Sequence, residues 1–221
     1  MLGALKRNYS IVLLLAAWEA AVRLGFAPPA LLPAPSAVAL ALIRDLGQAH
    51  FLSDFALTLY RLTVGLVIAI GAGVLIGIAA AQSWAGPLVL EPVVRVLSPL
   101  PKIVFFPALL AAYFGARAVD EKLVWSARAA GMSRTACLFR VVLPAALPSI
   151  LTGVRIAIVI GCIVVFLSEM VVPGDGLGDA LIRAARSFQT VQMFVPLVTI
   201  SLLGFVLDHA VVRVRDRLVN W

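Results

Sequence analysis

The chain has 221 residues, of which 62% are hydrophobic and only 13% are charged, and its mean hydropathy is +1.06. A soluble domain needs more polar and charged surface than this composition supplies. The net charge of +7 is explained by the Lys and Arg that cytoplasmic loops of membrane proteins collect, so it does not indicate nucleic-acid binding. We therefore expect an all-α integral membrane protein, a polytopic helical bundle surrounded by membrane lipid.

The first apolar run, residues 9–26, is the first predicted span. Lys6 and Arg7 precede it, and a basic flank of this kind places the N-terminus in the cytoplasm. Within the run, Glu19 and Arg23 are four residues apart. They therefore lie on one face of a helix and can pair.

Four prolines break the segment 27–54, which we expect to lie at the outer membrane surface. Within it, Ser36 is a good N-cap for a short helix over residues 37–46. The second predicted span, residues 55–81, contains no charge after Arg61. Its closely spaced glycines let another helix backbone approach, and packing within the subunit is the simpler use for them.

Prolines interrupt the third predicted span, residues 88–114, where Pro99, Pro101 and Lys102 fall close together. A proline removes a backbone hydrogen bond and kinks a helix. A broken helix at membrane depth must be buried in protein or line a cavity. The segment is therefore either a simple kink or part of a solute pathway, and the sequence supports both interpretations equally. In the second, Pro99, Pro101 and Lys102 are pathway residues.

A basic segment, residues 121–148, separates two apolar runs. Its basic residues recur about every six positions: Lys122, Arg128, Arg134 and Arg140. Such charge favours the cytoplasmic side of the membrane. We predict a helix over residues 123–130, then a turn at Gly131, because glycine accepts a positive φ, and then a second helix capped by Ser133.

The fourth visible span covers residues 150–172, after the chain re-enters the membrane at Leu143 and Pro144. It carries Arg155 near its inner end, and Ser168 and Glu169 near its outer end. Charges at membrane depth are candidates for function, so we treat these three residues as pathway candidates. Arg155 and Glu169 can alternatively extend to the membrane interface without a further role.

A glycine-rich outer loop with a short helix follows over residues 173–190, and the last span covers 191–212. Three arginines after it argue for a cytoplasmic C-terminus: Arg213, Arg215 and Arg217. Five spans conflict with this placement, because an odd number of crossings puts the two termini on opposite sides. Residues 115–120, at about 3.5 Å per extended residue, cannot cross a core of about 30 Å. Either the third segment is a re-entrant hairpin or, as we prefer, a sixth span is missing between Tyr113 and Val119.

Five segments carry a specific resemblance to a known family. They are residues 31–38 (LLPAPSAV), 97–115 (LSPLPKIVFFPALLAAYFG), 126–131 (SARAAG), 140–158 (RVVLPAALPSILTGVRIAI) and 168–178 (SEM followed by GDGLG). They resemble the permeases of the nitrate, sulfonate and taurine branch of ABC importers, and the resemblance extends over nearly the whole chain. It implies a type I importer bundle, with residues 1–221 forming a single transmembrane permease domain.

The resemblance implies the transmembrane permease subunit of an ATP-driven importer in the cytoplasmic (inner) membrane of a bacterium, with both termini in the cytoplasm. The solute would be a sulfonate, taurine, nitrate or a similar small anion. The implied partners are two ABC ATPase subunits, a second copy of the permease, and a periplasmic or lipid-anchored substrate-binding protein. The chain itself has no G-x-x-x-x-G-K-[ST] phosphate loop. We therefore expect a transport subunit rather than an enzyme, with ATP and Mg²⁺ bound by the ATPase and no cofactor on this chain.

The coupling loop of this family is expected to dock in a groove of the ATPase. The positions that the resemblance assigns to this contact are Glu121, Lys122, Trp125, Ser126, Ala127, Arg128, Ala130, Gly131, Met132 and Arg134. The family motif usually opens Glu-Ala-Ala, whereas this chain has Trp125, Ser126 and Ala127 there. The acidic contact is therefore absent or shared by Glu121. For Arg128, as for Arg134, a signal of membrane topology and a direct ATPase contact are equally good interpretations.

A secondary transporter or channel that works without an ATPase is the alternative function. Inverted repeats of broken helices, or acidic residues at mid-membrane, would favour it, and the sequence shows neither. Cys137 and Cys162 have no metal-ligand or redox spacing, and His50 and His209 are isolated. We therefore expect neither a metal site nor catalytic residues.

Overall fold

The computed structural model of the chain describes residues 9–82, 92, 113, 116 and 118–218. Every regular element among these residues is helical, which confirms the predicted all-α class. Three helical stretches in the described part are long and apolar enough to cross a membrane: Ala49–Ala80, Thr135–Val171 and Thr190–Arg217.

Several predictions fall on residues that the structure does not describe. These are most of the third predicted span, 88–114, with its pathway candidates Pro99, Pro101 and Lys102, and much of the join predicted between Tyr113 and Val119. They remain predictions.

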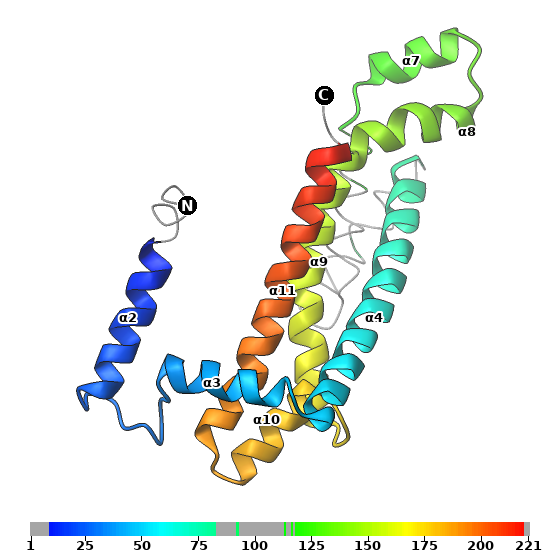
Figure 1. The fold of residues 1–221 in the computed structure, drawn as a ribbon. Helices are drawn as coiled ribbons and strands as arrows, with labels where there is room; N and C mark the ends of the chain where they lie inside the picture. The colour runs from blue at the N-terminus through cyan, green and yellow to red at the C-terminus, as the bar shows by residue number, and fades with distance from the viewer. Residues whose placement is uncertain (1–8, 83–91, 93–112, 114–115, 117, 219–221) are drawn as a thin grey trace. The chain divides into compact units, whose positions relative to one another are not determined.

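The described chain divides into two compact units. Unit 1 comprises Met1–Leu59 and Phe166–Leu202, and unit 2 comprises Tyr60–Val165 and Leu203–Trp221. Three long helices contribute residues to both units: α4 (Ala49–Gln82), α9 (Leu143–Val171) and α11 (Thr190–Leu218) (Figure 1).

Unit 1 also contains three shorter helices: α2 (Tyr9–Arg23), α3 (Pro35–Asp45) and α10 (Leu177–Arg186). The predicted pair on α2 forms, because Arg23 Nε donates to Glu19 at 2.7 Å. The predicted cap at Ser36 is wrong: the N-cap of α3 is Ala34, and Pro35 is the first helical residue. Proline suits that position because its φ is already helical. The Ser36 hydroxyl and backbone N–H instead donate to the Glu19 carboxylate, at 2.7 and 3.0 Å.

Unit 2 adds the short helices α7 (Glu121–Ala129) and α8 (Arg134–Cys137) and the π-helical turn η1 (Leu138–Val142). The turn η1 leads directly into α9, so helical structure begins well before the predicted span start at residue 150. The Leu143 N–H bonds to the Leu138 carbonyl, five residues back. This wider turn comes just before Pro144, which has no N–H to continue the ladder.

The core of unit 2 is formed by small and branched apolar residues on antiparallel helices. Ile78 of α4 packs with Ala146 and Ile150 of α9 in a buried cluster. Toward the other end of α9, a Cβ at Gly161 would lie only 2.9 Å from the Leu66 side chain. Residues later in α4 pack against residues earlier in α9, so the two helices are antiparallel. The absence of a side chain at Gly161 lets the helices approach closely.

The long helices carry many exposed apolar side chains. On α4, for example, Val67, Ile68 and Leu75 are each at least 65% exposed. A soluble surface seldom shows so much contiguous apolar area, whereas lipid or another apolar helix matches it. The apolar outer faces of the long helices and their lengths therefore both fit helices that cross a membrane.

Candidate functional site

Buried polar side chains surround the glycine-rich loop of unit 1. Asp54 and Thr58 come from α4 and Glu169 from α9, and their exposed fractions are 2%, 0% and 4%. Buried polar groups need hydrogen-bond partners, and here the backbone of the loop supplies them. We call these three residues and the backbone N–H groups of residues 176–178 the carboxylate network.

Three successive backbone N–H groups at the start of α10 each have a side-chain acceptor. Gly176 N–H donates to Asp54 at 2.9 Å, Leu177 N–H to the Thr58 hydroxyl at 2.9 Å, and Gly178 N–H to Glu169 at 3.1 Å. The Thr58 hydroxyl in turn donates to Glu169, at 2.9 Å to Oε2. The first N–H groups of a helix lack intrahelical acceptors, and its N-terminus favours negative charge. The network therefore caps α10 and joins it to α4 and α9.

Glycine is required at two positions of this loop because other atoms occupy the space beside them. A Cβ at Gly176, where φ is +129°, would lie 2.5 Å from the Glu169 carboxyl carbon. A Cβ at Gly178 would collide with the Phe166 carbonyl oxygen, a backbone atom that cannot rotate away. The two parts of the sequence SEM…GDGLG are thus complementary: the glutamate of the first part fills the space that the glycines of the second part leave.

Arg183 of α10 extends the network toward solvent. Its guanidinium donates to Asp54 at 2.6 Å, and it also pairs with Asp179 one helical turn earlier. A third contact, 3.3 Å long, joins it to His50 Nε2. The Asp54 side chain is 3% exposed and that of Arg183 is 40% exposed. The arginine therefore compensates a buried carboxylate from the surface.

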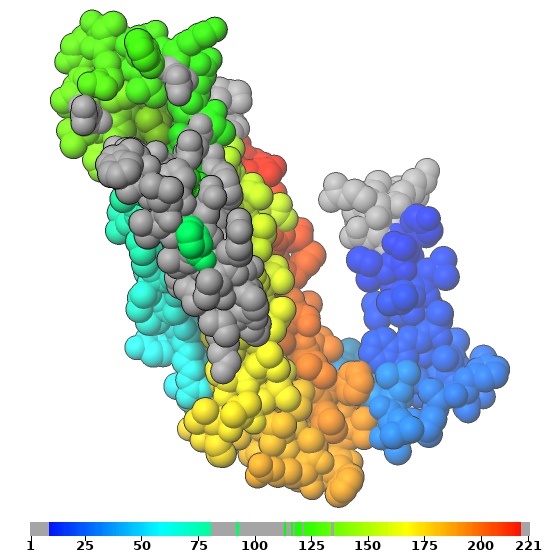
Figure 2. Space-filling model, turned by 180° about the vertical axis from the view of Figure 1, so that it is seen from behind, coloured from blue at the N-terminus to red at the C-terminus, as the bar shows by residue number. Residues whose placement is uncertain are grey.

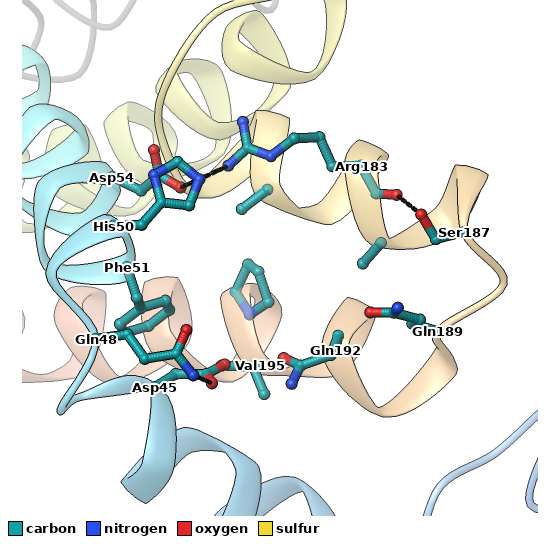
Figure 3. Close-up of a pocket in the computed structure, with 13 residues that line it drawn as sticks. Asp45, Gln48, His50, Phe51, Asp54, Arg183, Ser187, Gln189, Gln192 and Val195 are labelled. Carbon is teal, nitrogen blue, oxygen red and sulfur yellow. Dashed lines mark hydrogen bonds and ion pairs between the residues drawn. The ribbon is translucent and has the colours of Figure 1, made fainter.

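Unit 1 contains a cavity of about 300 Å³ beside this arginine (Figure 3). Its lining consists of Asp45, Gln48, His50, Phe51, Asp54, Ala180, Arg183, Ala184, Ser187, Gln189, Gln192, Val195 and Pro196. Asp45 is 7% exposed, and Gln48 donates to it at 3.0 Å. Burial raises the pKa of the Asp45 carboxyl above its ordinary value, and a hydrogen bond from Gln192 opposes this rise.

The helix α7 of unit 2 is capped at both ends. At its start, Asp120 accepts from Lys122 N–H at 2.9 Å. At its end, Met132 N–H bonds to Ala127 O at 3.2 Å and Gly131 N–H to Arg128 O at 3.0 Å. These two bonds and the Gly131 φ of +83° form a Schellman motif, which confirms the predicted glycine turn.

The predicted second helix after this turn is also present. Ala136 N–H donates to the Ser133 hydroxyl at 3.3 Å, so Ser133 caps α8 as predicted. Figure 2 shows α7 and α8 together on one surface of unit 2 (green).

The structure gathers the predicted coupling residues on α7, its turn and the start of α8. Lys122, Trp125, Ser126 and Arg128 are exposed, and Trp125 is 73% exposed. Ala130 and Gly131 are exposed as well, whereas Ala127 and Met132 are half-buried. Glu121 is the first residue of α7, and Arg134 is the first residue of α8.

The pathway candidates of the fourth span lie in different surroundings. Arg155 of α9 forms a two-point ion pair with Asp208 of α11, at 2.6 Å from Nε and 2.9 Å from Nη2, within unit 2. Ser168 is exposed, and Glu169 is buried in the carboxylate network of unit 1. Arg155 and Glu169 therefore both make specific polar contacts within the protein, and their part in a solute pathway stays a prediction.

Several residues of these sites were not predicted from the sequence. Asp208 could have been found from the sequence, because it and Arg155 are isolated opposite charges in two apolar runs and such charges often pair. Asp54 directly precedes the second apolar run. Thr58 had no signal, since a threonine within a helix is ordinary. Among the described residues no group of three or more His, Cys, Asp or Glu is arranged to hold a metal ion.

Residues 96–220 match the family described as "Binding-protein-dependent transport system inner membrane component". The chain belongs to this family. It is therefore a permease subunit of a transport system and has the helical fold that the resemblance implied. The matched region begins before α7 and continues through α11, so it contains the capped helix and the Arg155–Asp208 pair.

Three relatives are similar over most of their length. A Bacillus subtilis permease protein named for aliphatic sulfonates transport is 25% identical, with 94% of this chain and 84% of the relative aligned. The taurine transport system permease protein of Escherichia coli is 25% identical, covering 96% of this chain and 88% of the relative. The formylaminopyrimidine transport permease protein of Halalkalibacterium halodurans is 24% identical, covering 99% and 96%.

These alignments are longer than the chain itself. The last one runs over 242 residues, whereas 99% of the 221 residues is about 219. About 23 aligned positions of that relative, 242 less 219, therefore have no counterpart in this chain. That number of residues is close to the length of one membrane-spanning helix.

Proposed function

We propose that this permease subunit couples solute import to ATP hydrolysis by a partner ATPase, and that α7 with its Gly131 turn is the element that docks on the ATPase. The observation that carries the proposal is α7 itself, a nine-residue helix capped at both ends. Its fixed ends suit a helix that must transmit force as a rigid lever. It lies inside the segment that matches the family.

The exposed face of α7 supports a protein contact. Lys122, Trp125, Ser126 and Ala129 recur at helical spacing, and all four are exposed. An indole that is 73% exposed is unfavourable in water, and tryptophan is enriched among the residues that dominate binding at interfaces. We infer that Trp125 anchors the ATPase where the family motif usually places a glutamate, and that the positive charge of Lys122 and Arg128 complements acidic groups on the partner.

The charge distribution supports a bacterial inner-membrane topology with both termini in the cytoplasm. The basic segment around α7 lies on the cytoplasmic side in this proposal, and the loop before α10 lies outside. A substrate-binding protein docks on the outside, and a second copy of the permease completes the pathway. ATP and Mg²⁺ are bound by the ATPase. Both termini lie in the cytoplasm only if the number of crossings is even, and a sixth span missing between Tyr113 and Val119 is our preferred account of the odd count. About 23 aligned positions of one relative have no counterpart in this chain, which is compatible with that account.

We propose a small anion such as a sulfonate, taurine or nitrate as the solute, because two of the relatives are named for sulfonates and taurine. Uptake of radiolabelled taurine, ethanesulfonate and nitrate into proteoliposomes with the ATPase and binding protein tests this. Transport of none of the three would reject the solute class and leave the coupling proposal intact.

The coupling proposal is tested by Trp125→Ala in the purified full-length permease. The loss of an anchoring tryptophan weakens an interface by roughly 2 kcal/mol, about thirtyfold in affinity. We expect ATPase binding to weaken by that factor and substrate-stimulated ATP hydrolysis to fall accordingly. Phe188→Ala is the matched control, since Phe188 is 91% exposed in the turn after α10. It should leave ATPase affinity unchanged.

Gly131→Val provides a second, independent variant. A β-branched residue is strained at φ +83°, so the turn that presents α7 should be lost while membrane insertion persists. Wild-type ATPase binding and wild-type stimulation in both Trp125→Ala and Gly131→Val would contradict the assignment of α7.

A further inference from the structure

The cavity of unit 1 contains the buried carboxylate of Asp45, which is held by neutral side chains. Asp45 is 7% exposed, and its hydrogen-bond donors are the side-chain amides of Gln48 and Gln192. In the part of the chain that the structure describes, no basic side chain forms an ion pair with it. A buried negative charge held only by neutral amides is incompletely stabilised, and a cation that enters the cavity would complete its stabilisation.

The other charges around the cavity are largely engaged with one another. Arg183 pairs with Asp54 at 2.6 Å and also with Asp179. One guanidinium thus serves two carboxylates. His50 lies 3.8 Å from Asp54 and its side chain is 69% exposed, so even when charged it acts from the rim. With Asp45 added, negative groups outnumber positive ones around this space, and the cavity favours a cation over an anion.

We propose that this cavity binds a small organic solute through a protonated amine, which forms an ion pair with Asp45. The two glutamines hold the carboxylate in place, as Figure 3 shows for Gln48 and Asp45. Phe51, Val195 and Pro196 supply an apolar surface for a short carbon chain.

The size and exposure of the cavity fit this class of ligand. A volume of about 300 Å³ lies at the lower end of the range for small-molecule sites. Ser187 and Gln189 also line the cavity and are exposed, so they can bond a hydroxyl or amide on the far end of the solute. Burial raises the pKa of Asp45, which is the response expected of a carboxyl group that lacks a compensating cation.

This site goes beyond the proposed function and is tested without the ATPase. The purified full-length permease, in lipid nanodiscs at pH 7.5, is titrated with ethanolamine, ethylene glycol and glycolate. The three probes share a two-carbon skeleton and carry charges of +1, 0 and −1. Binding is followed by saturation-transfer NMR and calorimetry. We expect saturable binding of ethanolamine, and at least tenfold weaker binding of the other two.

Two variants locate the binding. Asp45→Asn keeps an acceptor for the glutamines but removes the charge, and should weaken ethanolamine binding at least tenfold. Ala180→Leu fills the cavity from α10 without changing charge, and should abolish binding. Asp216→Asn is the control: it removes the same charge from a residue of unit 2 that does not line the cavity, and should bind like wild type.

Three outcomes would overturn the proposal: no saturable ethanolamine binding to the wild-type protein, equal binding of ethylene glycol, or wild-type binding by both Asp45→Asn and Ala180→Leu. Because α7 takes no part in this measurement, a failure here would leave the ATPase-docking proposal standing. Conversely, Trp125→Ala should bind ethanolamine like wild type, which would show that a defect in ATPase docking leaves the cavity intact.

Discussion

Each of the two units of this permease is stabilised internally by a different kind of contact. Unit 1 depends on buried polar groups that bond to the backbone of one loop, with Asp54, Thr58 and Glu169 as the principal residues. Unit 2 depends on close contact between apolar helices, as at Gly161 and Ala146, together with the half-buried ion pair between Arg155 and Asp208.

This difference follows from what each unit must organise. Unit 1 contains several short helices and loops, whose free backbone N–H groups have to be satisfied where water is absent. Side-chain carboxylates and a hydroxyl satisfy them, and those bonds have strict geometry. The described core of unit 2 is built mainly from helices that satisfy their own backbones, so shape complementarity is sufficient. Unit 1 should therefore tolerate substitution less well than unit 2.

Gly178→Ala should produce the largest loss of stability. The new methyl group would collide with the backbone of Phe166 and with Glu169, so α10 must move and the Gly178 bond to Glu169 must break. We expect a loss of about 3 kcal/mol, from overpacking together with an unsatisfied buried group. The measurement is the thermal midpoint of the purified protein in detergent.

Gly174→Ala is the control for this change. Gly174 belongs to the same loop, but nothing lies within 4 Å of a Cβ built on it. Its midpoint should stay within about 1 °C of wild type, since surface substitutions away from special features usually have small effects. Equal losses in the two variants would show that the loop is sensitive to any side chain and that the close approach at Gly178 is unimportant.

Thr58→Val separates the hydroxyl of the network from its packing. Valine has nearly the same shape but removes the acceptor of Leu177 N–H and a donor to Glu169. We expect a loss of about 1–2 kcal/mol, read from the same thermal midpoint. Thr199→Val is the matched control, because Thr199 is also buried in unit 1 but its hydroxyl donates to the Val195 carbonyl of its own helix. If both variants lose the same stability, the network has no special role.

The ion pair of unit 2 should respond differently to paired substitution. Arg155→Leu alone leaves Asp208 without its two-point partner and should lower the thermal midpoint by a few degrees. The double variant Arg155→Leu with Asp208→Leu should recover most of that loss, because two apolar side chains suit adjacent membrane helices. A double variant less stable than either single one would show that unit 2, like unit 1, depends on a specific polar contact.

The prediction from sequence succeeded where a residue type has one physical use. Gly131 and Ser133 were assigned correctly, because a glycine after a short helix and a serine before the next one are local signals. It failed at Ser36, where the preceding proline is better suited to start the helix and a distant glutamate accepts the serine hydroxyl. Short-range preference cannot anticipate a partner seventeen residues away.

In the candidate sites, too, local sequence signals were predicted and long-range contacts were not. Glu169 was identified as unusual because it is charged within an apolar run, but its partners come from α4 and from the loop before α10. Only the fold brings Thr58 within reach of a residue 111 positions later. The cavity around Asp45 is likewise lined by two stretches far apart in the sequence, residues 45–54 and 180–196, so no local motif marks it.

The smallest effect we predict is a pH dependence from Asp45. Burial raises the pKa of its carboxyl above the ordinary value of 3.8, so the folded state binds this proton more tightly than the unfolded state. The resulting stabilisation is fully present below pH 3.8 and is lost as pH rises through the raised pKa. Wild type should therefore lose thermal stability relative to Asp45→Asn as pH rises from about 3.5 to 6, with no ligand added.

The comparison with Asp45→Asn is necessary because other groups titrate nearby. Asp54, His50 and Arg183 line the same cavity and are present in both proteins, so their contributions cancel to first order in the difference between the two midpoints. That difference should be smallest at the acidic end and should increasingly favour the asparagine variant toward pH 6. A difference that stays constant, or that favours wild type as pH rises, would mean that the buried carboxylate is already fully stabilised by Gln48 and Gln192. The Asp45 carboxylate of unit 1 would then need no cation, and unit 1 would differ from unit 2 only in its dependence on hydrogen-bond geometry.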